Sequence, residues 1–462
     1  MLVEAWLSRA AASRPDHVAL QTPAGRCSYA ELLDGASAAA AQLAQEGAGP
    51  GGRVAIALAP GIDFACALHA CMLLGAVAVP VDLRLSASER DAIASGCVLR
   101  VEQPLAGPAG GGDEASAIAA RARHELDATA VVIHTSGTSS APKPVELTYG
   151  NLLWSAFGSA VALGLDADER WLCALPLSHV GGLSILVRSA IYATTAVVHE
   201  RFETERVLHA LREERVTLVS LVATTLARLL DAGLSSPPAL RCALTGGGPV
   251  PAALVERARA AGVSVSMTYG LTESCSQVTT APVAALQRGE YSAGPALFCT
   301  RVRIAEDGEI LVRGPTVAPG AVAADGWLHT GDLGAIDARG LLSVSGRKAD
   351  TIISGGENVA PSEVEAVLES HPGVLEAAVV GLPDENWGEA VTAIVVLRTA
   401  DDAPLDQTTS LRVKCPTAPD EASLRAHCAA TLAPYKVPKR VILREQALPR
   451  TRSGKLLRRE LR

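Results

Sequence analysis

The sequence predicts an α/β protein that has a large N-terminal domain with several sheets and a smaller, mobile C-terminal α+β domain. Helical patterns alternate with short β-branched runs through the first two thirds of the chain, and such alternation is typical of largely parallel sheets. From Gly308 onward the pattern changes to short strands joined by tight turns. The chain has 462 residues, 48% of them apolar, which is enough for more than one hydrophobic core.

The elements of the first part follow from hydrophobic periodicity. We expect a short amphipathic helix within 1–20, a helix at 29–47, strands at 53–59 and 128–135, and a buried helix running into a short strand at 64–81. The stretch 64–81 is the most apolar of the chain. However, His69, Gly75 and Pro80 interrupt it, which argues against a membrane span.

The C-terminal part predicts a small α+β domain. We expect short antiparallel strands with tight turns within 309–314 and 341–354, and a turn around Asp325-Gly326. We further expect helices at 361–371 and 422–432 and strands at 374–383 and 390–397. The Gly-rich stretch 107–116 and the polar stretch 399–423 are predicted to be exposed loops. The predicted domains are an ATP- and acid-binding domain at 1–347, a hinge at 348–350 and a mobile domain at 351–462.

Composition narrows the class of protein. A net charge of −8 argues against a main role in coating nucleic acid or an anionic membrane. The ten cysteines show no C-x-x-C pair and no zinc-like spacing, so neither a metal cluster nor a disulfide framework is indicated. Glu4 and Arg9 interrupt the apolar run that a signal peptide needs. We therefore expect a cytoplasmic protein without a transmembrane segment.

The first motif that carries chemistry is a strand followed by a hydroxyl-rich loop at 131–145. The loop contains Thr135, Ser136, Gly137, Thr138, Ser139 and Ser140, and Lys143 closes it. Hydroxyl and main-chain N–H groups around a glycine form a concave donor surface, and a lysine adds positive charge for phosphate. The motif indicates a phosphate site, with an ordinary Ser/Thr-rich turn as the alternative. It lacks the Gly-Lys-Ser/Thr spacing of the common P-loop.

Two further motifs follow strands. Residues 244–250 contain Gly246, Gly247 and Gly248, where a base or ribose can approach the backbone closely. In 267–274, Thr272 and Glu273 follow Tyr269, and a carboxylate beside a hydroxyl suits a divalent ion that bridges phosphate oxygens. The alternatives are a plain loop and a solvated glutamate.

The last three motifs lie in the C-terminal third. Asp332, within 327–334, is predicted to occupy a tight turn and to accept hydrogen bonds from two ribose hydroxyls. Arg347 ends a strand and is followed by a pivot, a Gly-Gly loop and a capped helix. Lys455 follows Ser453-Gly454 in a basic tail, where the alternative is a solvated lysine.

The six motifs, in this order, resemble the adenylate-forming superfamily of acyl-CoA synthetases, peptide-synthetase adenylation domains and luciferases. The resemblance covers nearly the whole chain and implies ATP and Mg²⁺ as cofactors and coenzyme A as co-substrate. It implies that the β,γ-phosphates are held by Thr135, Ser136, Gly137, Thr138, Ser139 and Lys143. It further implies Thr272 at the α-phosphate and Glu273 as the Mg²⁺ ligand. The adenine and acid pockets are then lined by Gly246, Gly247 and Gly248, with Tyr269 stacking on adenine.

For the C-terminal third, the resemblance implies that Asp332 binds ribose beside Arg347 and that Lys455 contacts both the acid carboxylate and the α-phosphate. After rotation of the small domain, the coenzyme A thiol is guided by Gly355, Gly356 and Glu357. The sequence departs from the family pattern at Ser140 and Pro144, where glycine is usual, and at Ala349, where the hinge is often Asp or Lys. We still expect rotation, because backbone torsions carry a hinge. The active site is expected between the domains.

The stretch 175–198 concerns the acid. Together with 245–251 and 269–280, it resembles most the o-succinylbenzoyl-CoA synthetases of menaquinone biosynthesis, whose substrate keeps one carboxylate free. The acid site is then predicted to contain His179 as its gate, Arg188 for the spare carboxylate, and Ser184, Gly247, Ser274 and Ser276. Gly181-Gly182 is expected to open space beside His179. Arg188 lies in an apolar run and needs a partner. A core histidine is the alternative for His179.

Three other functions stay open at this point. The chain is alternatively a CoA ligase for another aryl or medium-chain acid, or a stand-alone adenylation enzyme that loads a carrier protein. The third is a non-catalytic nucleotide-binding or scaffolding relative. Retention of Glu273, Asp332, Arg347 and Lys455 argues against that one. The expected partners are the carboxylic acid, ATP and CoA, with no nucleic acid, and formation of a homo-oligomer is left open.

Overall fold

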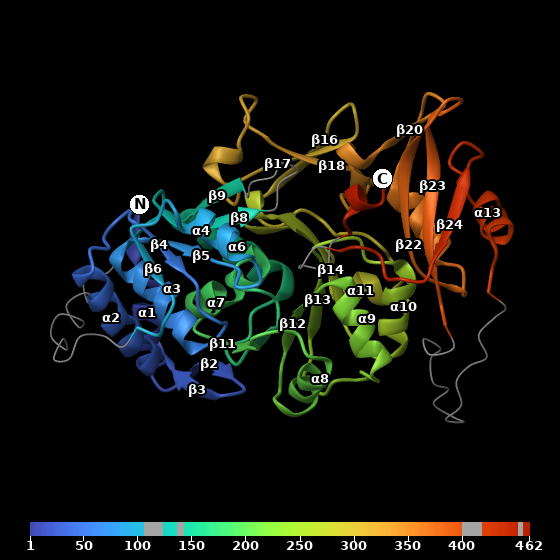
Figure 1. Ribbon diagram of the computed structural model, residues 1–462. Coiled ribbons are helices and arrows are strands. Elements are labelled where there is room, and N and C mark those ends of the chain that lie inside the picture. Colours follow the sequence, from blue (N-terminus) through green and yellow to red (C-terminus); the bar gives the residue numbers. More distant parts are fainter. Residues whose placement is uncertain (106–122, 136–142, 400–417, 451–455) are drawn as a thin grey trace. The chain divides into compact units, whose positions relative to one another are not determined.

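The computed structural model describes residues 1–105, 123–135, 143–399, 418–450 and 456–462 (Figure 1). By its internal contacts the chain divides into two compact units. Unit 1 comprises Met1–Gly247, Val255–Arg303 and Leu311–His329, and unit 2 comprises Gly248–Leu254, Ile304–Ile310 and Thr330–Arg462. No helix in the described ranges is both long and apolar enough to cross a membrane.

The largest sheet of unit 1 has eight strands. Their order is β15 (Ser276–Thr280), β14 (Val265–Leu271), β13 (Cys242–Thr245), β12 (Leu218–Leu221), β10 (Arg170–Cys173), β11 (Thr195–Val198), β2 (Val18–Thr22) and β3 (Gly25–Ser28). The strands from β14 to β2 run parallel, and β15 and β3 close the two edges antiparallel. Strands β11, β12 and β13 are buried along their whole length, as expected for parallel strands covered on both faces. This confirms the predicted α/β class.

A second sheet of unit 1 has five strands. Its order is β6 (Leu99–Val101), β4 (Arg53–Ile56), β5 (Val77–Pro80), β8 (Thr129–Thr135) and β9 (Lys143–Thr148). Only β9 is antiparallel to its neighbour. A separate two-stranded ladder pairs β1 (Leu2–Glu4) with β7 (Arg123–Glu125).

The helices near the N-terminus agree with the periodicity. They are α1 (Trp6–Ser13), α2 (Tyr29–Gln45), α3 (Ile62–Leu74) and α4 (Ala87–Ala94). Ser28 caps α2 by accepting a hydrogen bond from the backbone of Glu31, a capping box that fixes its start. Helix α3 is terminated by Gly75, which has a φ of 69°. Residues with a side chain rarely adopt this left-handed conformation. The apolar stretch 64–81 is therefore a buried helix that runs into β5, as predicted.

The remaining helices of this region are α6 (Tyr149–Leu163), α7 (Val180–Tyr192), α8 (Thr204–Glu213), α9 (Ala223–Asp231), α10 (Ala252–Ala260) and α11 (Val283–Gln287). Helices α6 and α7 pack against each other and against β15. Thr148 caps α6 together with Asn151. Helix α7 starts after His179, whose side chain makes no capping hydrogen bond. The packing of α6 on α7 positions the acid-binding candidates.

A four-stranded sheet contains β16 (Arg301–Ile304), β17 (Glu309–Arg313), β18 (Leu328–Ile336) and β19 (Leu342–Arg347), in that order. The tight turn predicted for Asp332 is wrong, because Asp332 lies within β18, opposite Arg347 of β19. The preceding Gly331 has a φ of 69°, and the register shifts between Leu333 and Gly334. A kink and a bulge inside one strand therefore accommodate the glycines that suggested a turn.

The C-terminal sheet has β21 (Glu357–Val359), β20 (Ile352–Ser354), β23 (Gly388–Leu397) and β22 (Val374–Asp384) in order, with β24 (Arg440–Arg444) parallel to β23. Helices α12 (Pro361–Glu369) and α13 (Glu421–Ala429) pack on one another and supply core residues such as Val364, Leu368 and Leu424. The predicted combination of helices and antiparallel strands in the C-terminal domain is therefore confirmed.

The stretch 341–354 forms two short strands, as predicted, because a 3-10 turn at Lys348–Asp350 separates β19 from β20. One local prediction for this region needs correction. Helix α12 has no side-chain cap; Ala360 precedes it and Pro361 is its first residue, which proline's fixed φ favours. The predicted loops at 107–116 and, for the most part, 399–423 lie outside the described residues.

Candidate active site

The candidate phosphate loop connects two paired strands. Thr135 ends β8, Lys143 begins β9, and the two residues are opposite each other in the ladder. The Thr135 hydroxyl donates a hydrogen bond to the carbonyl of Lys143 at 3.3 Å, and the Lys143 side chain is exposed. The remaining predicted residues of this loop, Ser136, Gly137, Thr138 and Ser139, lie outside the described part of the chain.

The three glycines follow β13 at the carboxyl end of the parallel sheet. A Cβ on Gly246 would lie 2.7 Å from the carbonyl oxygen of Thr268 on β14, so only glycine fits. Gly247 has a φ of 80°, and Gly247 and Gly248 are exposed. Tyr269 follows Thr268 on β14. The carboxyl ends of parallel strands are where ligands bind in open α/β sheets.

Thr272 and Glu273 lie in a 3-10 turn, η1 (Thr272–Ser274), between β14 and β15. The next two residues, Cys275 and Ser276, have φ values of 54° and 91°, in the left-handed region that non-glycine residues avoid. Such outliers cluster at functional sites because the surrounding structure must hold them. Strand β9, which carries Lys143, packs against η1. The structure thus brings the phosphate-loop strand beside Glu273.

The backbone of Glu273 is fixed from a second side. The N–H of Ala318 donates to the Glu273 carbonyl at 2.8 Å. The Asn151 amide donates to the carbonyls of Pro315 and Val317 at 2.8 and 3.0 Å, which holds this supporting segment on α6. Within the described ranges, no cation pairs with the half-buried Glu273 carboxylate. A carboxylate and a neighbouring hydroxyl are the oxygen donors that Mg²⁺ prefers, so the residues fit that ion.

His179 lies at the start of α7, near an ion pair that the sequence did not suggest. Asp82 and Arg84 follow β5, and Arg84 Nη2 contacts Asp82 Oδ2 at 2.6 Å. Burial lowers the pKa of His179, while the charge of Asp82 opposes this change. The imidazole is therefore neutral at neutral pH. A charged pair directly after the carboxyl end of a parallel strand is a positional signal that marks Asp82 and Arg84 as site candidates.

Of the two glycines beside His179, Gly182 does not open space as predicted, whereas a Cβ on Gly181 would meet only Leu175 Cδ1, at 3.6 Å. A Cβ on Gly182 would lie 2.5 Å from the carbonyl oxygen of Pro176. The space that a side chain at Gly182 would need is therefore occupied by the backbone of Pro176. On the same helix, the hydroxyl of Ser184 is directed to the carbonyl of Gly181 at 3.4 Å, a long contact for a hydroxyl donor.

Arg188 is the most unusual charged residue of unit 1. It is 2% exposed, and its guanidinium lies 5.5 Å from the centre of the Trp171 ring. Nη2 donates to the hydroxyl of Ser155 at 3.0 Å, whereas Nε has no hydrogen-bond partner in the part that the structure describes. No carboxylate of that part pairs with it. Burial lowers the pKa of the Arg188 guanidinium, but an arginine stays protonated in proteins.

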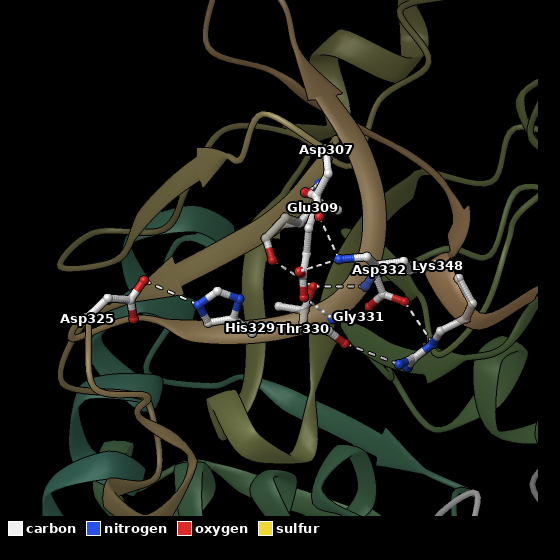
Figure 2. A network of polar contacts seen from close by, with 10 residues as sticks. Asp307, Glu309, Asp325, His329, Thr330, Gly331, Asp332 and Lys348 are labelled. Carbon is white, nitrogen blue, oxygen red and sulfur yellow. Dashed lines mark hydrogen bonds and ion pairs between the residues drawn. The ribbon is translucent and has the colours of Figure 1, made fainter. Parts of the chain in front are cut away.

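In unit 2, Asp332 and Arg347 come together as predicted, and Figure 2 shows Asp332 beside Thr330 and Gly331. Arg347 Nε contacts Asp332 Oδ1 at 2.8 Å, and Nη1 donates to the carbonyl of Thr330 at 3.2 Å. The Thr330 hydroxyl accepts from the N–H of Asp332 at 3.1 Å and donates to the carbonyl of Ile310 at 2.7 Å. A carboxylate fixed in this way is suited to accept hydrogen bonds from a vicinal diol.

The same region contains an acidic pair that holds Lys348 (Figure 2). Lys348 Nζ lies 2.5 Å from Asp307 Oδ2 and 3.2 Å from Glu309 Oε2. The other oxygen of Glu309 accepts from the N–H of Gly331 at 2.9 Å. These hydrogen bonds raise the pKa of Lys348, with that from Asp307 the largest contribution. Sequence reasoning missed this pair, because its acidic residues lie on β17 and in the turn before it, far from the hinge in sequence.

The Gly-Gly loop joins β20 to β21. Gly355 and Gly356 have φ values of 60° and 85°, so both positions favour glycine. The N–H of Gly355 donates to the carbonyl of Trp387 at 2.8 Å, and a Cβ there would lie 2.9 Å from the indole ring. Glu357 is exposed. Trp387 is a residue of this site that the sequence motifs did not include.

Lys455 lies outside the described residues, but its flanking residues do not. Arg450 and Leu456 form an isolated antiparallel bridge, and Arg450 pairs with Glu376 at 2.6 Å. Arg458 pairs with Glu365 at 2.7 Å and with Asp350 at 3.1 Å. The described residues on either side of Lys455 are therefore held by ion pairs and a backbone bridge within unit 2.

Family models match most of the chain. The model described as AMP-binding enzyme matches residues 7–102 and 98–321, and the model described as AMP-binding enzyme C-terminal domain matches residues 363–455. Among curated proteins, the 2-succinylbenzoate–CoA ligase of Bacillus subtilis (strain 168) is 38% identical over 490 residues, which cover 99% of this chain and 97% of the relative. The ligase of the same name from Geobacillus kaustophilus is also 38% identical, and the match covers 99% of this chain and 97% of that relative.

Solved structures agree with the family models. The o-succinylbenzoate CoA synthetase (MenE) from Bacillus subtilis, in complex with the acyl-adenylate intermediate OSB-AMP, has a TM-score of 0.86 and 37% identity, covering 100% of this chain and 98% of that one. ATP-bound MatB from Rhodopseudomonas palustris has a TM-score of 0.83 and 27% identity, and the match covers 99% of this chain and 98% of that one. The sequence motifs, the fold and these matches lead to one conclusion: the chain belongs to the AMP-binding enzyme family.

Proposed function

We propose that this chain is an ATP-dependent ligase that converts 2-succinylbenzoate, through an acyl-AMP intermediate, to its coenzyme A thioester in menaquinone biosynthesis. The observation that carries the choice of acid is Arg188, a buried cation with an unpartnered Nε and no carboxylate partner in the described ranges. A buried charge is costly unless it is paired. An acid with a second, unreactive carboxylate supplies the missing partner, and the curated relatives carry the name of such an acid.

In this proposal, the phosphates of ATP bind to the loop between β8 and β9, with Lys143 at its end. Thr272 contacts the α-phosphate, and Glu273 holds Mg²⁺, whose chemistry there is to neutralise phosphate oxygens. Tyr269 and the glycines after β13 accept adenine, and Asp332 binds the ribose hydroxyls with Arg347 beside it. A solved MenE structure from Bacillus subtilis contains ATP and magnesium ion, which supports this choice of cofactors.

In the first half-reaction, a carboxylate oxygen of the acid attacks the α-phosphorus, the bond to the β-phosphate breaks, and pyrophosphate leaves. The two reactants are both anionic and repel each other. Lys455 places a positive charge between the carboxylate and the α-phosphate, which favours the transition state over the separated reactants. His179 and Ser184 line the acid site, and Gly247 leaves room beside it.

In the second half-reaction, the coenzyme A thiol attacks the acyl carbon, and AMP leaves. We assign guidance of the thiol to Gly355, Gly356 and Glu357. We also propose that residues 348–350 are the hinge between domains 1–347 and 351–462. Residue 349 is alanine, so the backbone alone carries the rotation. We assign the reaction to the cytoplasm, where ATP and coenzyme A are available.

The test is ATP- and CoA-dependent turnover with 2-succinylbenzoate, benzoate, a medium-chain fatty acid and acetate, measured together with pyrophosphate release. We expect a strong preference for 2-succinylbenzoate, because benzoate and a fatty acid have only the carboxylate that reacts and provide no second one for Arg188. Preference for another acid contradicts the assignment of the acid but keeps the class of ligase. Pyrophosphate release without a CoA thioester indicates an enzyme that loads a carrier protein.

A further inference from the structure

One buried hydroxyl connects the candidate acid site to the turn that carries Thr272 and Glu273. Ser155 on α6 is 2% exposed. Its Oγ donates to the carbonyl of Cys275 at 2.6 Å and accepts from Nη2 of Arg188 at 3.0 Å. A hydroxyl has one proton, a carbonyl only accepts, and a guanidinium only donates. The direction of both hydrogen bonds is therefore fixed.

The carbonyl end of this connection belongs to a strained turn. Cys275 is fully buried and has a φ of 54°, which is unfavourable for a residue with a Cβ. Its N–H donates to the carbonyl of Thr272 at 3.0 Å, so its two peptide groups link Thr272 on one side to Ser155 on the other. The Ser155 hydrogen bond thus helps to hold the conformation that presents Thr272 and Glu273.

The other end of the connection is a cation with few constraints. Within the described part of the chain, Arg188 contacts the Trp171 ring face and donates one hydrogen bond, to Ser155. The hydrogen bond to Ser155 and the Trp171 ring therefore set the plane of the guanidinium. The direction in which Nε points depends on both.

We propose that Ser155 is a positioning residue: it orients Arg188 toward the second carboxylate of the substrate and links occupancy of that site to the turn containing Thr272 and Glu273. This inference rests on the proposed function, which assigns the spare carboxylate to Arg188. Because coupling between two sites is reciprocal, binding of the dicarboxylic acid and binding of ATP each favour the other through Ser155.

Ser155→Ala removes both hydrogen bonds. We expect the KM for 2-succinylbenzoate to rise about tenfold, the usual effect of losing a hydrogen bond to a charged group, while Ser155→Thr keeps the hydroxyl and restores most of the affinity. Ser159→Ala is the matched control. Ser159 is equally buried on the same helix, but its hydroxyl makes no hydrogen bond to Arg188 or Cys275, so the KM values of Ser159→Ala should stay within about twofold of the parent. Thermal unfolding of each variant checks that it is folded.

A double-mutant cycle with Arg188→Ala separates this inference from the proposed function. If Ser155 acts through Arg188, both single variants raise the KM for 2-succinylbenzoate, and the double variant is no worse than Arg188→Ala alone. If Arg188→Ala raises that KM but Ser155→Ala behaves like Ser159→Ala, the role of Ser155 is wrong and the proposed function stands. If Arg188→Ala leaves the KM unchanged, the assignment of the spare carboxylate fails, and the role of Ser155 fails with it.

Discussion

At the scale of single residues, the candidate site contains two carboxylates in different surroundings. Glu273 is held through its backbone by Ala318, and its carboxylate pairs with no cation of the described residues. Asp332, in contrast, is buried and paired with Arg347 at 2.8 Å. The first arrangement suits a carboxylate that awaits a metal ion, and the second suits one that recognises hydroxyl groups.

Glu273→Gln tests the first of these roles. The amide keeps the size of the side chain but removes the negative charge that binds Mg²⁺. We expect the Mg²⁺ concentration for half-maximal pyrophosphate release to rise at least tenfold, while the KM for 2-succinylbenzoate changes little. The measurement is a Mg²⁺ titration at saturating ATP. An unchanged titration curve means that Glu273 is not a ligand of the metal.

At the scale of elements, one arginine joins three parts of unit 2. Arg458 lies in the 3-10 turn η5 (Arg458–Glu460) and pairs with Glu365 of α12 and with Asp350 of the turn Lys348–Asp350. Burial raises the pKa of Glu365, and the charge of Arg458 opposes this effect. Glu365 also accepts from the N–H of Val379 on β22 at 2.8 Å. The tail, the helix and the predicted hinge are thus linked by one ion-pair network.

Arg458→Met removes the cation but leaves Glu365 buried. Breaking a buried pair by removing one partner costs about 3–5 kcal/mol, so we expect a marked decrease in the Tm of unit 2. Arg459→Met is the control, because Arg459 is exposed. The double variant Arg458→Met with Glu365→Leu should recover part of the loss, since no unpaired charge remains. Equal Tm values for the two single variants contradict this role of Arg458.

At the scale of the whole molecule, two buried histidines make stability depend on pH. Burial lowers the pKa of His69 to about 4 and that of His124 to about 3. His124 stacks on Tyr149 with ring centres 4.4 Å apart and accepts from the N–H of Trp6 at 3.2 Å. Both imidazoles are therefore neutral in the folded protein at neutral pH.

In the unfolded chain, a histidine has a pKa of about 6.5. As the pH falls below that value, the unfolded state takes up protons that the folded state does not, so the free energy of unfolding decreases by about 1.4 kcal/mol per pH unit and histidine. The decrease continues until the folded pKa values are reached. We expect the Tm to fall by several degrees between pH 7 and pH 5. His124→Leu should reduce the slope of Tm against pH, whereas His209→Gln, on an exposed position of α8, should not.

The proposed hinge makes a prediction about the whole reaction cycle. Lys455 acts only in the first half-reaction, and the loop Gly355–Gly356–Glu357 acts in the second. Lys455→Ala should therefore reduce adenylate formation by several orders of magnitude and spare thioester formation from supplied acyl-adenylate. Single-turnover measurements of each half-reaction decide this. Equal losses in both half-reactions contradict the division of roles.

The sequence by itself determined the α/β class, the main helices and strands, and the family. These properties depend on local periodicity and on the spacing of motifs along the chain. The requirement for glycine at Gly246 also has a sequence signal, although its cause, the carbonyl of Thr268 at 2.7 Å, is a matter of strand pairing. Periodicity failed where a local kink changed an element, as at Gly331, which allows Asp332 to lie in a strand instead of a turn.

Apart from Asp332 and Arg347, whose proximity the motifs predicted, only the tertiary structure decided which side chains meet. Ser155 contacts Cys275, 120 residues further along the chain, and Arg188, 33 residues further along. Asp82 lies within electrostatic range of His179, and Lys348 is held by Asp307 and Glu309. None of these pairs has a spacing that a pattern predicts. They depend on how helices α6 and α7 pack on the sheet edge and how β17, β18 and β19 are ordered, because hydrogen bonds and ion pairs act over a few ångströms of space and not along the sequence.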